Sequence, residues 1–314
     1  MGVLRRGGNG VSERTVSVII PVYRPDEKFV NLLRGLKKQT YPILEIIVMN
    51  TEKRYYQEEQ YPRLEQLEVF HITKKNFDHG GTRDEAARKA RGDILLFMTQ
   101  DAVPADARLV ERLVKAFDAE EVAAAYARQL PAPDCRLIER YTRAFNYPKQ
   151  SSVRTKSDVA KYGIKTYFCS NVCAAYRRQV YHDLGGFEKR TIFNEDMIFA
   201  AKIIQNGYAI AYCADAAVIH SHNYSGKQQF HRNFDLAVSQ ADHPEIFSSV
   251  PSEREGIRLV KSTALFLLRK KKPLEVFRLF YVSVCKYAGY FLGKRYRALP
   301  MFLVKKFSMN RGYW

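Results

Sequence analysis

The sequence predicts an α/β protein whose mainly parallel sheet is flanked by helices. Between residues 16 and 126, short apolar runs alternate with segments whose apolar residues recur at helical spacing. The runs are nearly continuous, which is typical of strands covered by helices on both faces. The chain has 314 residues, 46% hydrophobic and 27% charged, so it can bury a full core. These proportions exclude disordered and collagen-like proteins.

Five strands are expected in this first part, at residues 16–21, 45–49, 67–72, 94–98 and 122–126. We expect Pro21 to close the first of them. Asp26 is placed to cap the next helix, whose apolar residues recur at i, i+3, i+4 and i+7. Further helices are expected near residues 81–90 and after Asp106, which we interpret as a second cap. Sheets of this kind bind ligands beyond the carboxyl ends of their strands, so the segments that follow the strands should hold the site.

The pattern is less regular from residue 130 to 250. Residues 148–165 are polar and predict a loop, and residues 168–175 predict a strand. A helix is expected over residues 197–205, and two short strands over 209–212 and 217–220. We therefore divide the chain into a flexible arm (1–14), an α/β domain (15–250) and a basic amphipathic helical extension (251–314).

Charge and cysteine content suggest where the protein works. From residue 254 onward there are fifteen Lys and Arg residues and two Glu, a net charge of +13 out of +18 for the whole chain. Such a tail points to an anionic partner, either a nucleic acid or a membrane surface. No signal peptide and no uncharged apolar run of 18 residues is present. Five cysteines without metal-ligand spacing are typical of a reduced, cytoplasmic protein.

Polar and aromatic side chains follow several of the predicted strands. Tyr23 follows the first, Asn50-Thr51-Glu52 the second, Gly80-Gly81-Thr82-Arg83 the third, and Gln100-Asp101 the fourth. Together they suit a nucleoside diphosphate, with Tyr23 near the ring and Arg83 on a phosphate. Asp101 could hold Mg²⁺ or Mn²⁺ between the phosphates, because both ions accept oxygen ligands. The alternative is that Gly80-Gly81 is a plain helix entry and Asp101 a turn cap.

Two further groups could carry chemistry. Glu195 and Asp196 are adjacent acids at a predicted helix start, where they could cap the helix or supply a general base for an acceptor hydroxyl. His220 and His222 flank Ser221 at a strand end, so we expect their side chains to diverge. One of them could then reach the metal, and a lone His is otherwise a structural residue.

In their order and spacing, these segments resemble the family-2 glycosyltransferases, which have the Rossmann-like GT-A fold. The resemblance spans roughly residues 15–245 and rests on Val18–Tyr23, Gln39–Pro42, Thr82-Arg83, Thr99–Ala102, Gly185-Gly186-Phe187 and Asn194–Asp196. Within this family, five segments resemble those of the bacterial rhamnosyltransferase branch: Gln100-Asp101-Ala102, Phe77–Arg83, His220–Tyr224, Lys286–Tyr290 and Tyr313-Trp314.

The resemblance implies inverting, metal-dependent transfer of a sugar from a nucleotide sugar. Asp196 would be the base, with Glu195 as its neighbour, and the metal would be held by Asp101 with His220 or His222. The residues implied to bind the nucleotide sugar are Pro21, Tyr23, Thr51, Gly81, Arg83, Gln100 and Asp101. Many relatives carry two acids after the second strand, a place where this chain has Asn50-Thr51-Glu52, so Thr51 would replace a carboxylate.

The same resemblance favours dTDP-L-rhamnose as donor and a lipid-linked cell-surface polysaccharide as acceptor. The basic tail would then attach the protein peripherally to the inner face of the cell membrane. It could instead pack on the α/β domain or on a second copy in a homo-oligomer. A transferase that uses a UDP-hexose, or a catalytically silent subunit, would fit the same motifs. The basic tail would also suit a nucleic-acid-binding protein, although no recognised binding motif accompanies it, and nucleic acid is not expected as a partner.

Overall fold

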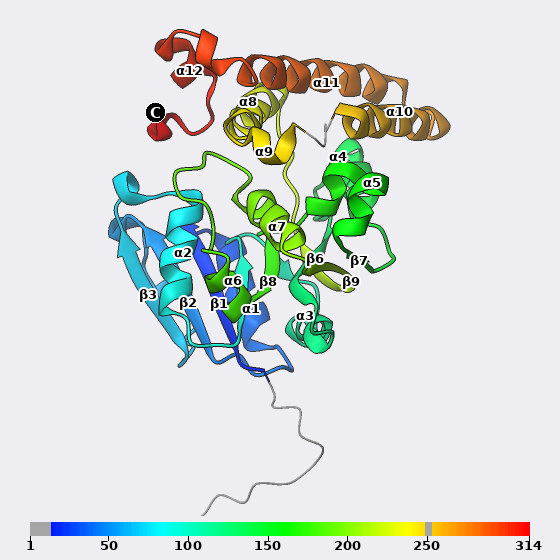
Figure 1. Ribbon diagram of the computed structural model, residues 1–314. Coiled ribbons are helices and arrows are strands. Elements are labelled where there is room, and N and C mark those ends of the chain that lie inside the picture. The colour runs from blue at the N-terminus through cyan, green and yellow to red at the C-terminus, as the bar shows by residue number, and fades with distance from the viewer. Residues whose placement is uncertain (1–13, 249–252) are drawn as a thin grey trace, which may run out of the picture.

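The computed structural model describes residues 14–248 and 253–314 (Figure 1). A mixed sheet runs through the centre in the order β3-β2-β1-β4-β8-β6-β9-β5, and β7 also pairs with β9. Its strands are β1 (Val16–Tyr23), β2 (Glu45–Thr51), β3 (Leu67–Ile72), β4 (Ile94–Met98), β5 (Val103–Pro104), β6 (Val122–Leu130), β7 (Ser152–Arg154), β8 (Cys173–Arg177) and β9 (Ala209–Ile219).

Strand direction brings several carboxyl ends to one edge of the sheet. Strands β1 to β4 are parallel to one another, and β8 lies antiparallel between β4 and β6. Strand β6 therefore points the same way as β4, and β9 is parallel to β6. The ends of β1, β2, β4, β6 and β9 consequently share an edge, where a ligand site is expected.

Helices cover both faces of this sheet, as the continuous apolar strands predicted. One face packs on α1 (Glu27–Lys37) and α3 (Leu109–Lys115), and the other on α2 (His79–Lys89), α6 (Arg178–Asp183) and α7 (Glu195–Gln205). Two further helices, α4 (Leu137–Asn146) and α5 (Val159–Tyr162), lie beyond β6. Each face has its own fully buried aromatic residues, among them Phe29 and Phe117 on one and Phe97, Tyr181 and Phe199 on the other.

Most predicted elements are confirmed, with several corrections to their ends. Asp26 caps α1 by accepting the Lys28 N–H. Pro21 does not close β1, which continues to Tyr23 through its pairing with β2. Strand β4 pairs with β1 only up to Ile19, so no hydrogen bond to β4 requires the N–H that Pro21 lacks. Asp106 is not the N-cap of α3, since it accepts the Arg108 N–H one residue before the helix begins at Leu109.

Three predictions between residues 148 and 220 are wrong in detail. Residues 148–165 are not a plain loop, because they form β7 and α5. The strand expected over 168–175 is shorter and later, at Cys173–Arg177. The two short strands expected near 209–220 are one strand, β9, which a register shift after Cys213 divides. Such a bulge breaks the alternation of apolar residues that a sequence pattern detects.

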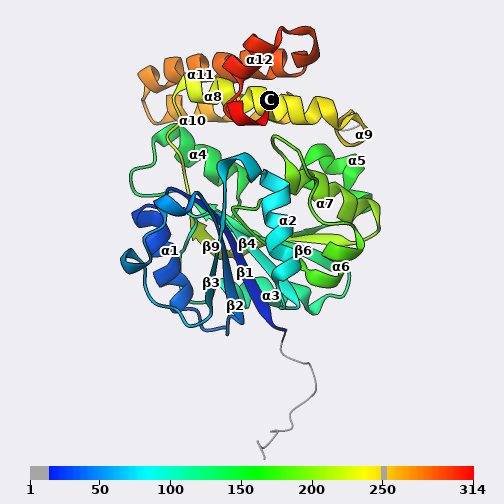
Figure 2. The same cartoon turned by 90° about the vertical axis from the view of Figure 1, so that its left-hand side faces the viewer.

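A second layer of helices covers the carboxyl edge of the sheet (Figures 1 and 2). It contains α8 (Gly226–Asp242), α9 (Pro244–Phe247), α10 (Glu253–Arg269), α11 (Pro273–Gly293) and α12 (Met301–Phe307). The layer begins at α8, whereas the sequence predicted that the helical extension starts at residue 251. That predicted boundary, between residues 250 and 251, lies outside the described residues. The predicted arm lies outside them too, except for Arg14. Among the described residues, no helix combines the length and apolar character that a bilayer span requires.

Close packing joins α8 to α11. A Cβ on Gly289 would lie 2.2 Å from the Phe230 carbonyl oxygen, and one on Gly293 would lie 2.3 Å from that of Phe234. Only glycine allows the two backbones to approach this closely. Because Phe230 faces Gly289 and Phe234 faces Gly293, the two helices run in the same direction.

Candidate active site

Sheet topology brings Asp101 to His220. Strand β5 is antiparallel to β9 and pairs Val103 with Ile219. Asp101 stands two residues before Val103, and His220 directly follows Ile219. The short β5–β9 ladder therefore joins the segment after β4 to the segment after β9.

Asp101, His220 and His222 form one cluster. The Nε2 atoms of both histidines lie 3.4 Å from Oδ2 of Asp101, and the three potential ligand atoms are all within 4.8 Å of one another. The expectation that the two imidazoles diverge is wrong. Strand β9 ends at Ile219, so the alternation of side chains across a strand no longer applies at residues 220–222. The His222 ring also stacks on Tyr224, with ring centroids 4.9 Å apart.

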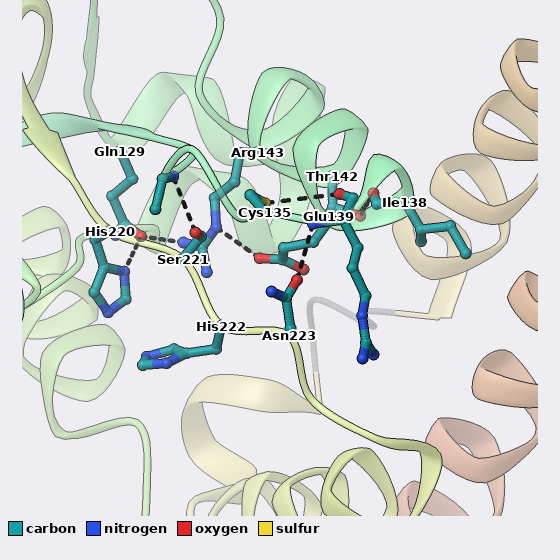
Figure 3. Close-up of polar contacts among 12 residues, drawn as sticks. Gln129, Cys135, Ile138, Glu139, Thr142, Arg143, His220, Ser221, His222 and Asn223 are labelled. Atoms are coloured by element: carbon teal, nitrogen blue, oxygen red, sulfur yellow. Dashed lines mark hydrogen bonds and ion pairs between the residues drawn. The ribbon is translucent and has the colours of Figure 1, made fainter.

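A buried network fixes the orientation of the His220 ring (Figure 3). Nδ1 of His220 lies 3.0 Å from Oε1 of Gln129, and Arg143 donates to the same oxygen. Because that amide oxygen can only accept, Nδ1 of His220 carries the proton. Nε2 then faces the Asp101 carboxylate, and a proton or a shared metal ion between the two atoms makes this contact favourable.

This donor set fits a divalent metal ion. Burial is the main cause that lowers the pKa of His222 to about 4, so the ring is neutral at pH 7. Burial acts to raise the pKa of Asp101, but His220 and His222 outweigh it and hold that pKa well below its usual range. One carboxylate and two imidazoles, one oriented by a second hydrogen bond, are ligands that first-row divalent metals accept.

Glu195 and Asp196 begin α7 and differ in their electrostatics. Burial acts to raise the pKa of Glu195, but the charges of Arg83 and His79 outweigh it, and that pKa is lowered. Burial, followed by the negative charge of Glu195, raises the pKa of Asp196 to about 7. Asp196 accepts hydrogen bonds from the backbone N–H groups of Asn171 (3.1 Å) and Met197 (2.8 Å). Such a carboxylate can exchange a proton near neutral pH.

Arg83 lies inside the protein, close to Glu195, rather than at an open edge. Its side chain donates to the His79 carbonyl oxygen at 2.8 Å and lies 3.3 Å from Oε1 of Glu195. Only 6% of the residue is exposed. Gly81, in the same first turn of α2, donates its N–H to the N-cap residue Asp78. In this structure Arg83 therefore pairs with a carboxylate in the position where the sequence suggested a phosphate contact.

The ends of β1 and β2 form an aromatic edge. Pro21 is half-buried two residues before Tyr23, whose ring is exposed and meets Tyr55 edge-on at 5.6 Å. Gln100 accepts the Tyr23 N–H at 2.7 Å and donates to the Tyr23 carbonyl oxygen at 3.2 Å, which ties β1 to the segment before Asp101. At the end of β2, the side-chain oxygens of Asn50 and Thr51 are buried without a hydrogen-bond partner within the described structure.

Sequence reasoning missed Gln129, Arg143 and Asn171. Gln129 was detectable, because it is a lone amide near the end of the otherwise apolar strand β6. Asn171 lies in a loop and donates hydrogen bonds to both Glu195 and Asp196, which follow it in the sequence by 24 and 25 residues. No local pattern signals such a contact.

Comparison with known proteins identifies the class. Residues 17–185 match glycosyl transferase family 2, and the chain therefore belongs to this family. The O-antigen chain rhamnosyltransferase RfbN of Salmonella typhimurium is 41% identical over 305 residues, which cover 95% of this chain and 96% of the relative. The O-antigen chain rhamnosyltransferase WbaN of Salmonella anatum is 43% identical and covers 77% of this chain and 78% of the relative. The protein is thus a glycosyltransferase.

Solved structures confirm the GT-A fold. The mannosyltransferase PcManGT from Pyrobaculum calidifontis, in complex with GDP-Man and Mn²⁺, superposes with a TM-score of 0.59 at 17% identity and covers 90% of this chain and 89% of that one. Residues 1–349 of S. aureus TarS, in complex with UDP, give a TM-score of 0.51 at 18% identity and cover 90% and 91%. At these identities the likeness concerns the fold alone.

Proposed function

We propose that this protein is an inverting rhamnosyltransferase that transfers L-rhamnose from dTDP-L-rhamnose to a hydroxyl group of a lipid-linked polysaccharide acceptor. The observation that carries the proposal is its 41% identity to an O-antigen chain rhamnosyltransferase along nearly the whole length of both chains. The site residues described above supply the groups that such a transfer needs.

In this proposal the nucleoside lies at the aromatic edge. Tyr23, exposed at the end of β1, would contact the base, with Pro21 and Gln100 holding its backbone. The unpartnered oxygens of Asn50 and Thr51 support a donor group of the base or ribose nearby, because buried polar atoms are rarely left unpaired. Arg83 and Gly81 would support the site without contacting the donor. Arg83 would hold Glu195 in place, and Gly81 would stabilise the start of α2 by donating its N–H to Asp78.

Asp101, His220 and His222 would hold the metal ion, and two imidazole ligands favour Mn²⁺ over Mg²⁺. When bound, the ion would neutralise negative charge on the departing diphosphate. Asp196 would take the proton of the acceptor hydroxyl group. Burial and then the negative charge of Glu195 keep the pKa of Asp196 near 7, and Glu195 is itself held by Arg83.

The outer face of α11 supports docking to an anionic membrane surface. Phe277 and Phe280 are 73% and 70% exposed, and Tyr287 is 65% exposed on the same side. Basic residues follow both α10, at 270–272, and α11, at 294, 295 and 297. Exposed aromatic residues flanked by cations are typical of helices that lie in the interface of a bilayer. A lipid-linked acceptor would be presented at such a surface.

The donor can be tested by thermal denaturation of the purified protein with a panel of nucleotide sugars, each with and without Mn²⁺. A ligand at 100 times its Kd stabilises the folded state by about 2.7 kcal/mol. We expect a metal-dependent rise in Tm with dTDP-L-rhamnose, followed by rhamnose transfer to an isolated lipid-linked acceptor. If only UDP-hexoses raise the Tm, the donor is a UDP-hexose and not dTDP-L-rhamnose. If no nucleotide sugar raises the Tm, the proposal is contradicted.

A further inference from the structure

Helix α11 and the N-cap residue of α4 bring three cations to a pocket beside the metal-ligand cluster. We call it the basic pocket; it is lined by Arg136, Glu139, His222, Tyr224, Arg278 and Lys286, among other residues. Arg278, Val282 and Lys286 follow one another at four-residue spacing, so they lie on one face of α11. The glycine contacts between α8 and α11 turn this face inward, toward α4 and the segment after β9.

The cations of this pocket lack partners. Within residues 14–248 and 253–314, no hydrogen bond or ion pair is formed by the side chains of Arg136, Arg278 or Lys286. The acid of the pocket, Glu139, is engaged by Arg143 at 2.7 Å. The pocket therefore has more positive charge than its own carboxylate can compensate. Arg278 and Lys286 are half-buried and Arg136 is exposed, so an anionic ligand that entered the pocket would meet cations that no carboxylate of the pocket already engages.

Arg232 on α8 extends this group of cations toward Asp196. Its guanidinium lies 4.5 Å from the centroid of the Phe193 ring, and within the described structure it makes no hydrogen bond or ion pair. Burial lowers the pKa of Arg232, and it also lowers that of Lys286, where the charge of Arg232 adds to the effect. Arg232 stands three residues after Gln229, which lines the basic pocket, so the two residues share one face of α8.

We propose that Arg232, Arg278 and Lys286 bind a diphosphate group, in a subsite that the helical layer contributes next to Asp101 and His222. A diphosphate carries several charged oxygens, and guanidinium groups bind such oxygens in pairs. His222 faces both the metal-ligand cluster and the basic pocket, so one ligand can reach both. This inference rests on the proposed function, in which the nucleotide-sugar donor contains a diphosphate; an acceptor joined to its lipid through a diphosphate would be a second source of the same group.

The test measures binding of three probes by titration calorimetry: inorganic pyrophosphate, dTDP and geranyl diphosphate. Each is measured in EDTA and in Mn²⁺. The variants are Arg232→Gln and Lys286→Gln, and the matched control is Lys270→Gln, which removes a cation that is exposed after α10. Arg232→Lys keeps the charge and should keep most of the affinity. Tm values show whether each variant is folded.

We expect each Gln variant to weaken pyrophosphate binding about 10-fold in EDTA, with Lys270→Gln unchanged. A parallel loss for dTDP identifies the donor as the source of the diphosphate, and a loss for geranyl diphosphate alone identifies the acceptor. Unchanged binding of all three probes by the folded variants overturns the subsite. Wild-type protein that binds pyrophosphate through these cations yet transfers no rhamnose would contradict the proposed function and leave the subsite standing.

Discussion

Gln129 accepts a hydrogen bond from Nδ1 of His220 at 3.0 Å, and this contact leaves Nε2 of the imidazole free to face Asp101. Gln129 also donates to Ser170 and accepts from Arg143, so its amide group has one orientation. A residue outside the metal-ligand cluster therefore sets the protonation of one of its members.

We expect Gln129→Met, which keeps the volume but loses the acceptor, to weaken Mn²⁺ binding about 10- to 100-fold. Calorimetric titration with Mn²⁺ measures the change. Gln129→Glu retains an acceptor for His220 and should bind the metal nearly as tightly as the wild type. Gln179→Met, at an exposed position, is the control. Equal affinity in wild type and Gln129→Met would show that this hydrogen bond does not govern metal binding.

Asp196→Asn should reduce the rate of transfer about 100- to 10,000-fold, because the amide cannot take a proton from the acceptor hydroxyl. Asn retains an oxygen that can accept the Asn171 N–H, so the fold should persist. The measurement is kcat at saturating donor, together with the Kd of dTDP. Loss of dTDP binding, rather than of turnover, would assign Asp196 to the donor site.

The pH dependence of transfer should report the Glu195–Asp196 pair. With the pKa of Asp196 raised to about 7, its carboxylate is largely protonated at pH 6, so the rate should rise between pH 6 and 8. Glu195→Gln removes a negative neighbour that raises this pKa. The acid limb of the pH–rate profile should therefore move to lower pH, whatever happens to the maximum rate. A limb that stays in place would show that another group titrates there.

Gly289→Ala should destabilise the helical layer, because its Cβ would lie 2.2 Å from the Phe230 carbonyl oxygen. Overpacking of this kind costs about 1–3 kcal/mol. Limited proteolysis of α11 and the Tm measure the effect. Gly256→Ala is the matched control, since nothing lies within 4 Å of its added Cβ and a helical alanine should raise stability slightly. Equal stability of the two variants would mean that α11 shifts to relieve the contact.

Phe277→Ser combined with Phe280→Ser should weaken binding to vesicles that contain anionic lipid by about 100-fold or more, since burial of each aromatic ring contributes about 1.5–3 kcal/mol. Co-sedimentation with vesicles measures the change. Leu44→Ser, which alters an exposed apolar side chain of the sheet domain, is the control. If the double variant sediments with vesicles as the wild type does, α11 does not dock there.

The α/β class, most strand and helix positions, and the residues after β1, β2 and β4 could all be predicted from the sequence. These features depend on local patterns: apolar runs, helical spacing and capping residues such as Asp26. The sequence also predicted Asp101 as a metal ligand, with one of the two histidines as a candidate second ligand. The tertiary structure alone decided that His220 and His222 converge, because this follows from where β9 ends and from its pairing with β5.

The partners of the site residues were likewise decided only in three dimensions. Gln129 meets His220 across 91 positions of sequence, and Arg83 meets Glu195 across more than a hundred. The cations of the basic pocket become neighbours because glycines let α8 and α11 touch. A local pattern specifies a segment's own conformation, whereas such contacts depend on how separate segments pack, and the structure alone records that packing.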